Sequence, residues 1–227
     1  MDALLLDYNG VIVHDEPLHF ASFRAILAEE GIALSEPEYF AHYLGLNDRV
    51  AFQKAFEPAG RDTSRAAIEP YVQRKSRAYL RLAERDLQVV PGVTAFVEAA
   101  ARSARVAVVS GALGSEIPLG LRRAGIAGLV EVLVTSDDIT TSKPDPEGFR
   151  IALARLAAMH GTRDWRAVVI EDSLPGVGAA RALGAGCVAI TTSYGIGALH
   201  DADAVWTSFE GHVPSDLDPL WRGVAVA

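Results

Sequence analysis

Five short apolar runs recur along the chain, and helical spacing of hydrophobic residues follows the later ones. The runs hold Val, Ile, Leu and Ala without polar alternation, which is typical of strands buried on both faces of a sheet. One helical pattern begins at Phe149, with apolar residues three, four and seven positions later, and Gly184 ends another. This alternation predicts an α/β fold with a Rossmann-like parallel sheet. The predicted strands cover residues 3–6, 106–109, 130–135, 167–170 and 187–190.

An inserted segment separates the first apolar run from the second. The gap is about a hundred residues, whereas the later runs follow at intervals of about 20 to 35. Because this segment has helical periodicity throughout, we predict a helical cap domain over residues 16–86. The core domain would then consist of residues 1–15 and 87–227. The predicted cap helices lie at residues 20–31, 36–44, 49–56 and 68–87.

The composition narrows the class of protein. Half of the 227 residues are hydrophobic and 22% are charged, which excludes a disordered chain. The net charge of -8, without any basic cluster, argues against nucleic acid or an anionic membrane as a partner. No leader peptide or membrane-length run is present, so we expect a cytoplasmic protein. The absence of an obvious exposed apolar seam in the sequence favours a monomer. Cys187 lies within an apolar run and is expected to be an inert buried thiol.

Candidate chemistry follows the apolar runs, because ligands of open α/β sheets bind beyond the carboxyl ends of the strands. Asp7 follows the first run, Ser110 and Gly111 follow the second, and Glu171 and Asp172 follow the fourth. Lys143 lies in the loop after the third run and is one of only three lysines, against 18 arginines. We therefore expect carboxylates, a hydroxyl and a lysine at one edge of the sheet.

Three carboxylates at the ends of buried strands need a neutralising cation, since an unpaired buried charge is costly. Hard oxygen ligands of this kind suit Mg²⁺. Asp7 or Asp172 alone could instead cap a turn or a helix. The six histidines show no zinc spacing, and no Gly-Lys-Ser/Thr phosphate loop is present. The sequence thus predicts a magnesium site.

Four motifs in this order resemble those of the haloacid dehalogenase-like hydrolases, in the branch of β-phosphoglucomutase and phosphoglycolate phosphatase. The resemblance covers essentially the whole chain. It implies the fold of that family, a helical cap and hydrolysis of a phosphoric monoester. The motifs are Asp7-Tyr8-Asn9-Gly10-Val11, Val108-Val109-Ser110-Gly111, Ser142-Lys143-Pro144-Asp145-Pro146-Glu147-Gly148-Phe149 and Ile170-Glu171-Asp172-Ser173-Leu174-Pro175-Gly176-Val177.

The resemblance also implies roles for the motif residues. Asp7 would attack phosphorus and form an aspartyl phosphate, which water then hydrolyses. Mg²⁺ would be held by Asp7, Asp172 and the backbone carbonyl of Asn9, and Glu171 would hold a metal-bound water. Ser110 and the amide of Gly111 would donate hydrogen bonds to the phosphate, while Lys143 would neutralise phosphate and nucleophile.

Asn9 departs from the family pattern, in which a second Asp protonates the leaving oxygen and later activates water. An amide can do neither, and three explanations compete. In the first, Asp15 or Glu16 takes over the proton transfer. In the second, the chemistry is not that of a phosphatase. The chain could be a phosphonatase, which needs a cap lysine such as Lys54 or Lys75, or a metal-independent dehalogenase. In the third, the protein binds phosphate without catalysis.

The predicted cap would decide the substrate. His19 is either a substrate contact or a surface histidine packed near aromatic residues, and Arg49 either pairs with a second anionic group or belongs to a helix N-terminus. Lys54, Arg74 and Lys75 are expected on solvated helix faces. We expect a Mg²⁺-dependent phosphatase of a small phosphorylated metabolite. A mutase is less favoured, because a mutase depends on the acid that Asn9 replaces.

Overall fold

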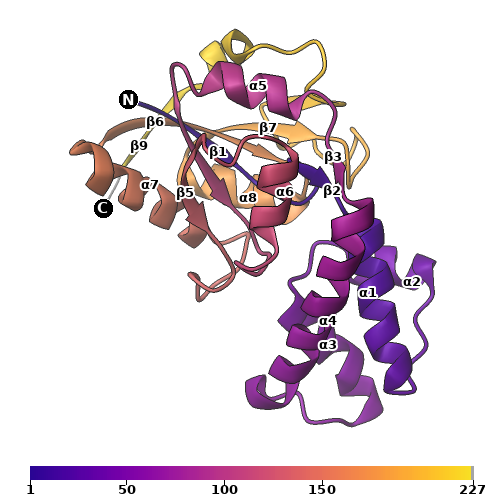
Figure 1. Cartoon of the computed structure of the whole chain (residues 1–227). Coiled ribbons are helices and arrows are strands. Elements are labelled where there is room, and N and C mark those ends of the chain that lie inside the picture. Colours follow the sequence, from indigo (N-terminus) through magenta and orange to yellow (C-terminus); the bar gives the residue numbers. More distant parts are fainter. Residues whose placement is uncertain (226–227) are drawn as a thin grey trace. The chain divides into compact units, whose positions relative to one another are not determined.

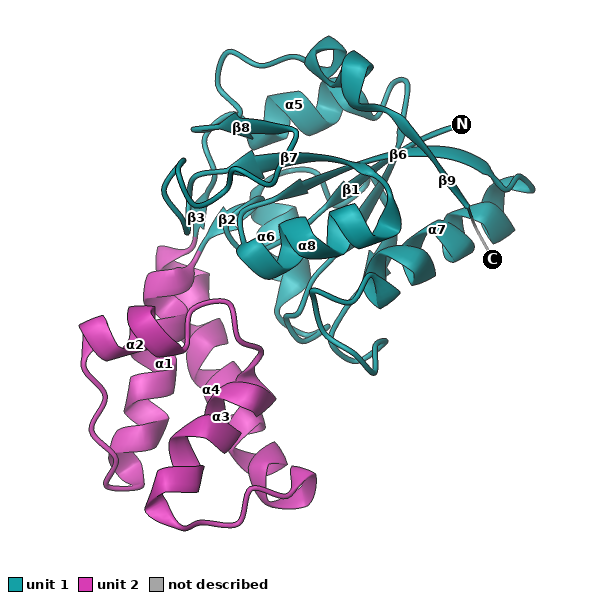
Figure 2. Cartoon of the chain, turned by 180° about the vertical axis from the view of Figure 1, so that it is seen from behind, with its two compact units in different colours: residues 1–14, 88–227 teal, residues 15–87 magenta. Residues whose placement is uncertain are grey.

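The computed structural model describes residues 1–225, and the chain divides into two compact units. The core unit comprises Met1–His14 and Gln88–Ala227, and the helical unit comprises Asp15–Leu87 (Figure 2). Within the described residues, no helix combines the length and the apolar character that a membrane crossing requires. Each unit has its own buried core.

The core unit is built on a seven-stranded sheet, which confirms the predicted parallel α/β fold. Its path is β5-β4-β1-β6-β7-β8, all parallel, and β9 pairs antiparallel with β6. The short strands β8 and β9, and the two-stranded antiparallel sheet of β2 and β3, were not predicted from the apolar runs. The strands are β1 (Asp2–Leu6), β2 (Val13–His14), β3 (Gln88–Val89), β4 (Arg105–Val109), β5 (Val130–Val134), β6 (Asp164–Glu171), β7 (Gly186–Ile190), β8 (Ala204–Trp206) and β9 (Arg222–Ala225).

Helices cover both faces of this sheet. Seen from opposite sides, Figures 1 and 2 show α5 (Val93–Ala100) and α6 (Ile117–Arg123) on one face, and α7 (Glu147–His160) and α8 (Leu174–Leu183) on the other. Side chains alternate along a strand, so the fully buried β1 contributes to both hydrophobic layers. The short 3₁₀ helix η2 (Pro214–Leu220) contacts α5.

The helical unit contains four α-helices and one 3₁₀ turn. These are α1 (Glu16–Glu29), α2 (Glu36–His42), α3 (Asp48–Phe56), η1 (Glu57–Ala59) and α4 (Arg65–Asp86). The long α4 contacts both α1 and α3. An aromatic core joins the helices, with the rings of Phe23 and Phe52 in an edge-to-face contact at 4.7 Å. Ser35 and Glu38 form a capping box that begins α2.

The strand order places the switch point of the fold beside β1. After β1 the chain adds β4 and β5 on one side, and then crosses to add β6, β7 and β8 on the other. The carboxyl ends of β1 and β6 therefore lie next to each other, with Leu6 paired with Ile170 in register. Ligands of doubly wound sheets bind at such a point, because the loops leave it in opposite directions.

Candidate active site

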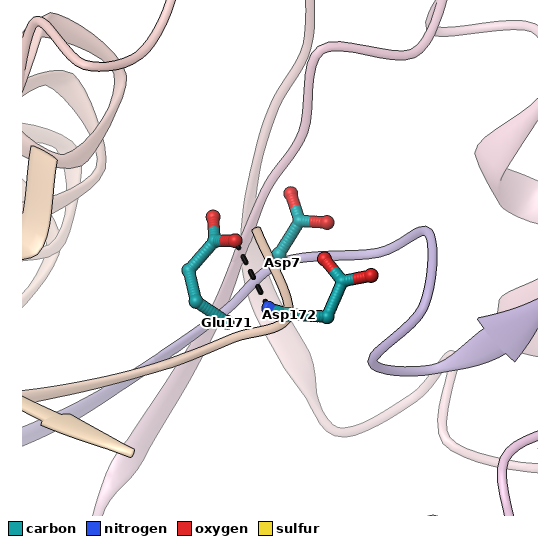
Figure 3. Close-up of side chains that lie close together, drawn as sticks. All are labelled: Asp7, Glu171 and Asp172. Carbon is teal, nitrogen blue, oxygen red and sulfur yellow. Dashed lines mark hydrogen bonds between the residues drawn. The ribbon is translucent and has the colours of Figure 1, made fainter. Parts of the chain in front are cut away.

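Three buried carboxylates meet at this switch point: Asp7, Glu171 and Asp172 (Figure 3). Each offers one oxygen, and the three oxygens lie within 4.8 Å of one another. Asp7 directly follows β1, and its backbone N–H donates to the carbonyl of Ile170 on β6 at 3.0 Å. The pairing of two parallel strands thus brings together residues that are more than 160 positions apart in the sequence.

Lys143 is the positive charge that these carboxylates share. Its Nζ donates to Oδ1 of Asp7 at 2.5 Å, to the carbonyl of Val109 at 3.2 Å and to Oε1 of Glu171. Burial on its own would lower the pKa of Lys143, but the charges of Asp7 and Glu171 outweigh burial and raise it. Lys143 is therefore an ammonium ion at neutral pH.

One ammonium ion does not balance three carboxylates. Burial, followed by the charge of Glu171, raises the pKa of Asp7 to about 7 despite the opposing charge of Lys143. Burial, together with the charges of Glu171 and Asp7, raises the pKa of Asp172 well above its usual value. This surplus of negative charge on hard oxygen donors fits a divalent cation.

Both oxygens of the Glu171 carboxylate are hydrogen-bonded within the protein. Its Oε1 accepts from Lys143, and its Oε2 accepts from the backbone N–H of Asp172 at 3.1 Å and the hydroxyl of Ser173 at 2.9 Å. A Cβ on Gly176 would lie only 1.9 Å from the carboxyl carbon, so the first turn of α8 must approach it without a side chain. Both carboxylate oxygens of Glu171 therefore accept hydrogen bonds from other groups of the protein.

Two hydroxyl groups that follow β7 enclose Asp172. Ser193 donates its hydroxyl hydrogen to Oδ2 of Asp172, and Oγ1 of Thr192 lies 3.4 Å from the same oxygen. Gly10, with a positive φ of 74°, is packed so closely that a Cβ would lie 1.8 Å from this Oδ2. Sequence reasoning missed Thr192 and Ser193, although they follow the last of the five apolar runs.

Asn9 and Ser110 also come together in the core unit. The hydroxyl of Ser110 donates to Oδ1 of Asn9 at 3.2 Å and accepts from the backbone N–H of Ala112 at 3.0 Å. Ser110 is buried at the end of β4, whereas the adjacent Gly111 is exposed. All four predicted motifs therefore converge at one edge of the sheet.

The model of the family described as "Haloacid dehalogenase-like hydrolase" matches residues 4–190. The chain belongs to this family. It is 27% identical over 185 residues to the phosphorylated carbohydrates phosphatase of Thermotoga maritima, covering 81% of this chain and 82% of the relative. The predicted family is confirmed.

Solved structures of the same family share the fold. CbbY from Rhodobacter sphaeroides in complex with phosphate has a TM-score of 0.82 and 25% identity, covering 95% of this chain and 98% of that one. A putative β-phosphoglucomutase from Thermotoga maritima has a TM-score of 0.69 and 25% identity, covering 96% and 99%. The haloacid dehalogenase fold therefore spans nearly the whole chain.

The helical unit holds a second buried polar group, which we call the helical-unit cluster: Asp15, His19, Asp48, Lys75 and Tyr79. Oδ2 of Asp15 accepts from the Tyr79 hydroxyl at 2.5 Å and lies 3.1 Å from Nε2 of His19. Nζ of Lys75 lies 2.5 Å from Nδ1 of His19 and 2.9 Å from Oδ1 of Asp48. The rings of His19 and Tyr79 stack at 4.3 Å.

The expectation of a solvated Lys75 was wrong, because its side chain is only 1% exposed. Lys75 lies on the buried face of α4, one turn before Tyr79, where Asp48 neutralises its charge. His19 is likewise not a surface histidine, since its side chain is 15% exposed and contacts both Asp15 and Lys75. Periodicity cannot reveal this arrangement, because a lysine in a helical pattern is usually solvated.

The remaining predicted residues of the helical unit have partners within that unit. Glu16 accepts from the Tyr39 hydroxyl at 2.5 Å, and Nε of Arg49 donates to Glu69 at 3.0 Å. Arg74 pairs with Glu29 and Glu30, and the exposed Lys54 donates to the carbonyl of His42 at 2.7 Å.

Cys187 lies in the core unit, on β7. Its side chain is buried, and burial raises the pKa of the thiol. A buried thiol that stays protonated is a poor nucleophile. Cys187 is therefore a packing residue of the sheet.

Proposed function

We propose that this chain is a Mg²⁺-dependent phosphatase of a small phosphorylated metabolite, with Asp7 as the nucleophile. The observation that carries the proposal is the group of three buried carboxylates at the switch point, two of which, Asp7 and Glu171, pair with the ammonium of Lys143. A relative named as a phosphatase of phosphorylated carbohydrates, and a similar structure with bound phosphate, support this substrate class.

In this proposal Asp7 attacks phosphorus, the bond to the leaving oxygen breaks, and water later hydrolyses the aspartyl phosphate. Lys143, hydrogen-bonded to Asp7 and Glu171, orients the nucleophile and offsets the phosphate charge. Ser110 and the amide of Gly111 donate to phosphate oxygens. Mg²⁺, held by Asp7, Asp172 and the backbone carbonyl of Asn9, would supply Lewis acidity and offset the remaining negative charge.

Asn9 cannot act as the acid, so we propose that Asp15 protonates the leaving oxygen and then accepts a proton from the attacking water. Asp15 follows Asp7 by eight residues and is buried in the helical unit. Its carboxylate is oriented by Tyr79 and His19, which suits a group that must present one oxygen in a fixed direction.

Phosphate release from an aryl phosphate and a panel of sugar phosphates, with Mg²⁺ or with EDTA, tests the proposed activity. We expect turnover with Mg²⁺, loss of turnover with EDTA, and no turnover for Asp7→Ala under either condition. Turnover that survives both EDTA and Asp7→Ala would contradict the proposal. Binding of phosphate without any turnover would instead favour a non-catalytic protein.

The leaving group tests the role of Asp15, since a good leaving group needs little protonation. Asp15→Asn should lower kcat for a sugar phosphate by about 10²-fold, and by much less for an aryl phosphate. Glu16→Gln is the matched variant, because its carboxylate also lies in the first turn of the helical unit. Equal losses on both substrates would contradict acid catalysis by Asp15, and a selective loss in Glu16→Gln would transfer the role to Glu16. Asn9→Asp should restore part of the activity that Asp15→Asn loses.

A further inference from the structure

The two oxygens of the Asp172 carboxylate have different surroundings. Ser193 donates to Oδ2, and the backbone of Gly10 is packed against the same oxygen. Thr192 also lies 3.4 Å from Oδ2, but its hydroxyl donates to the carbonyl of Gly10 at 2.6 Å. A hydroxyl has one hydrogen, so Ser193 rather than Thr192 supplies the hydrogen bond to Asp172.

This enclosure leaves Oδ1 as the oxygen of Asp172 that can face a cation. Figure 3 shows one carboxylate oxygen of Asp172 on the side of Asp7 and the other turned away from it. A hydrogen bond to one oxygen fixes the rotation of the carboxylate about its terminal bond. A cation at the three carboxylates would then meet a single oxygen of Asp172.

We propose that Ser193 is a positioning residue, which holds Asp172 as a ligand through one oxygen and thereby favours Mg²⁺ over Ca²⁺. Mg²⁺ needs near-ideal octahedral geometry at about 2.1 Å and suits carboxylates that bind through one oxygen. Ca²⁺ takes six to eight ligands at about 2.3–2.6 Å and readily accepts both oxygens of a carboxylate. Without the hydrogen bond from Ser193, the Asp172 carboxylate could rotate and offer both of its oxygens to a cation.

This inference rests on the metal dependence in the proposed function, and metal binding itself tests it without any assay of activity. Isothermal titration calorimetry of the full chain with MgCl₂ and with CaCl₂ gives the two dissociation constants. For Ser193→Ala we expect Mg²⁺ to bind about 10-fold more weakly, the lower end of the range for residues that orient metal ligands. Ca²⁺ binding should change by less than about 3-fold, so the preference for Mg²⁺ falls.

Two further substitutions separate the hydroxyl from the shape of the side chain. Ser193→Thr keeps the hydroxyl donor and should retain the Mg²⁺ affinity. Ser193→Val has the shape of threonine without the donor and should show the weaker Mg²⁺ binding of Ser193→Ala. Ser103→Ala is the matched control, because that serine is exposed and its hydroxyl donates to the nearby backbone carbonyl of Ala100. Thermal melting without metal shows that each variant is folded.

Unchanged Mg²⁺ affinity in both Ser193→Ala and Ser193→Val would overturn the inference. Equal weakening of Mg²⁺ and Ca²⁺ would overturn the selectivity that it assigns to Ser193. Failure of the unaltered protein to bind Mg²⁺ would be a different result, since it would overturn the metal dependence of the proposed function and the inference with it.

Discussion

Both units of the protein bury charged side chains, but they balance the charge differently. In the core unit, the ammonium of Lys143 pairs with Asp7 and Glu171, and Asp172 lies beside them as a third buried carboxylate. In the helical unit, Lys75 lies between Asp48 and His19. The first group carries surplus negative charge, whereas in the second the ammonium of Lys75 pairs with the carboxylate of Asp48.

The two groups differ in how far their own side chains balance the buried charge. Burial is costly for any charge, so a stable group of buried charges normally contains its own counter-ions. Burial and the neighbouring carboxylates raise the pKa values of Asp7 and Asp172, in keeping with incomplete compensation in the core unit. A cation, and then a phosphoryl group bound to it, would complete the core site.

The strongest way to break the core site is to remove its nucleophile. Asp7→Asn should lower phosphatase turnover by at least about 10³-fold, because an amide does not attack phosphorus. Asp201→Asn is the matched control, since Asp201 is an exposed partner of Arg181. Steady-state phosphate release measures both variants. Comparable turnover in Asp7→Asn and the control would show that Asp7 is not the nucleophile.

Removing the lysine of each group sharpens the comparison. Lys143→Met should lower the free energy of unfolding by about 3 kcal/mol, because it leaves buried carboxylates without a counter-ion. Lys75→Met should lower it by about 1–3 kcal/mol, because it leaves the half-buried carboxylate of Asp48 without its ammonium partner. Saturating Mg²⁺ should stabilise every variant whose core site binds it, so each loss is measured against the unaltered protein at the same Mg²⁺ concentration. This difference in the free energy of unfolding should shrink for Lys143→Met, because Mg²⁺ offsets the charge of its carboxylates, and should stay unchanged for Lys75→Met. Urea unfolding of the unaltered protein and both variants, with and without Mg²⁺, measures these free energies. An equal effect of Mg²⁺ on the stability loss of both variants would mean that the two groups do not differ in their need for a cation.

A smaller effect on stability is expected from a methyl group added beside the Glu171 carboxylate. Gly176→Ala should destabilise the core unit by about 1–2 kcal/mol, because the new methyl group would overlap the Glu171 carboxylate. Gly128→Ala is the control, since a Cβ there meets no atom within 4 Å. Thermal unfolding compares the two. Equal melting temperatures would show that Glu171 can move away at little cost.

The sequence determined the sheet, the family and the residues that meet at the end of β1. Continuous apolar runs are diagnostic of strands buried on both faces, and parallel strands bring the residues that follow them to one edge. Asp7, Ser110, Lys143 and Asp172 could therefore be named before any coordinates. Short strands such as β8 and β9 carry too few residues to produce a pattern.

Only the tertiary structure decided which polar side chains are buried and which atoms they contact. Lys75 belongs to an ordinary helical pattern, and it is buried because α1 and α3 both pack on α4 and provide His19 and Asp48. Ser193 belongs to no motif, and it reaches Asp172 because β7 lies beside β6. Periodicity reports the face on which a residue lies, whereas a hydrogen bond depends on distances between atoms that are remote in sequence.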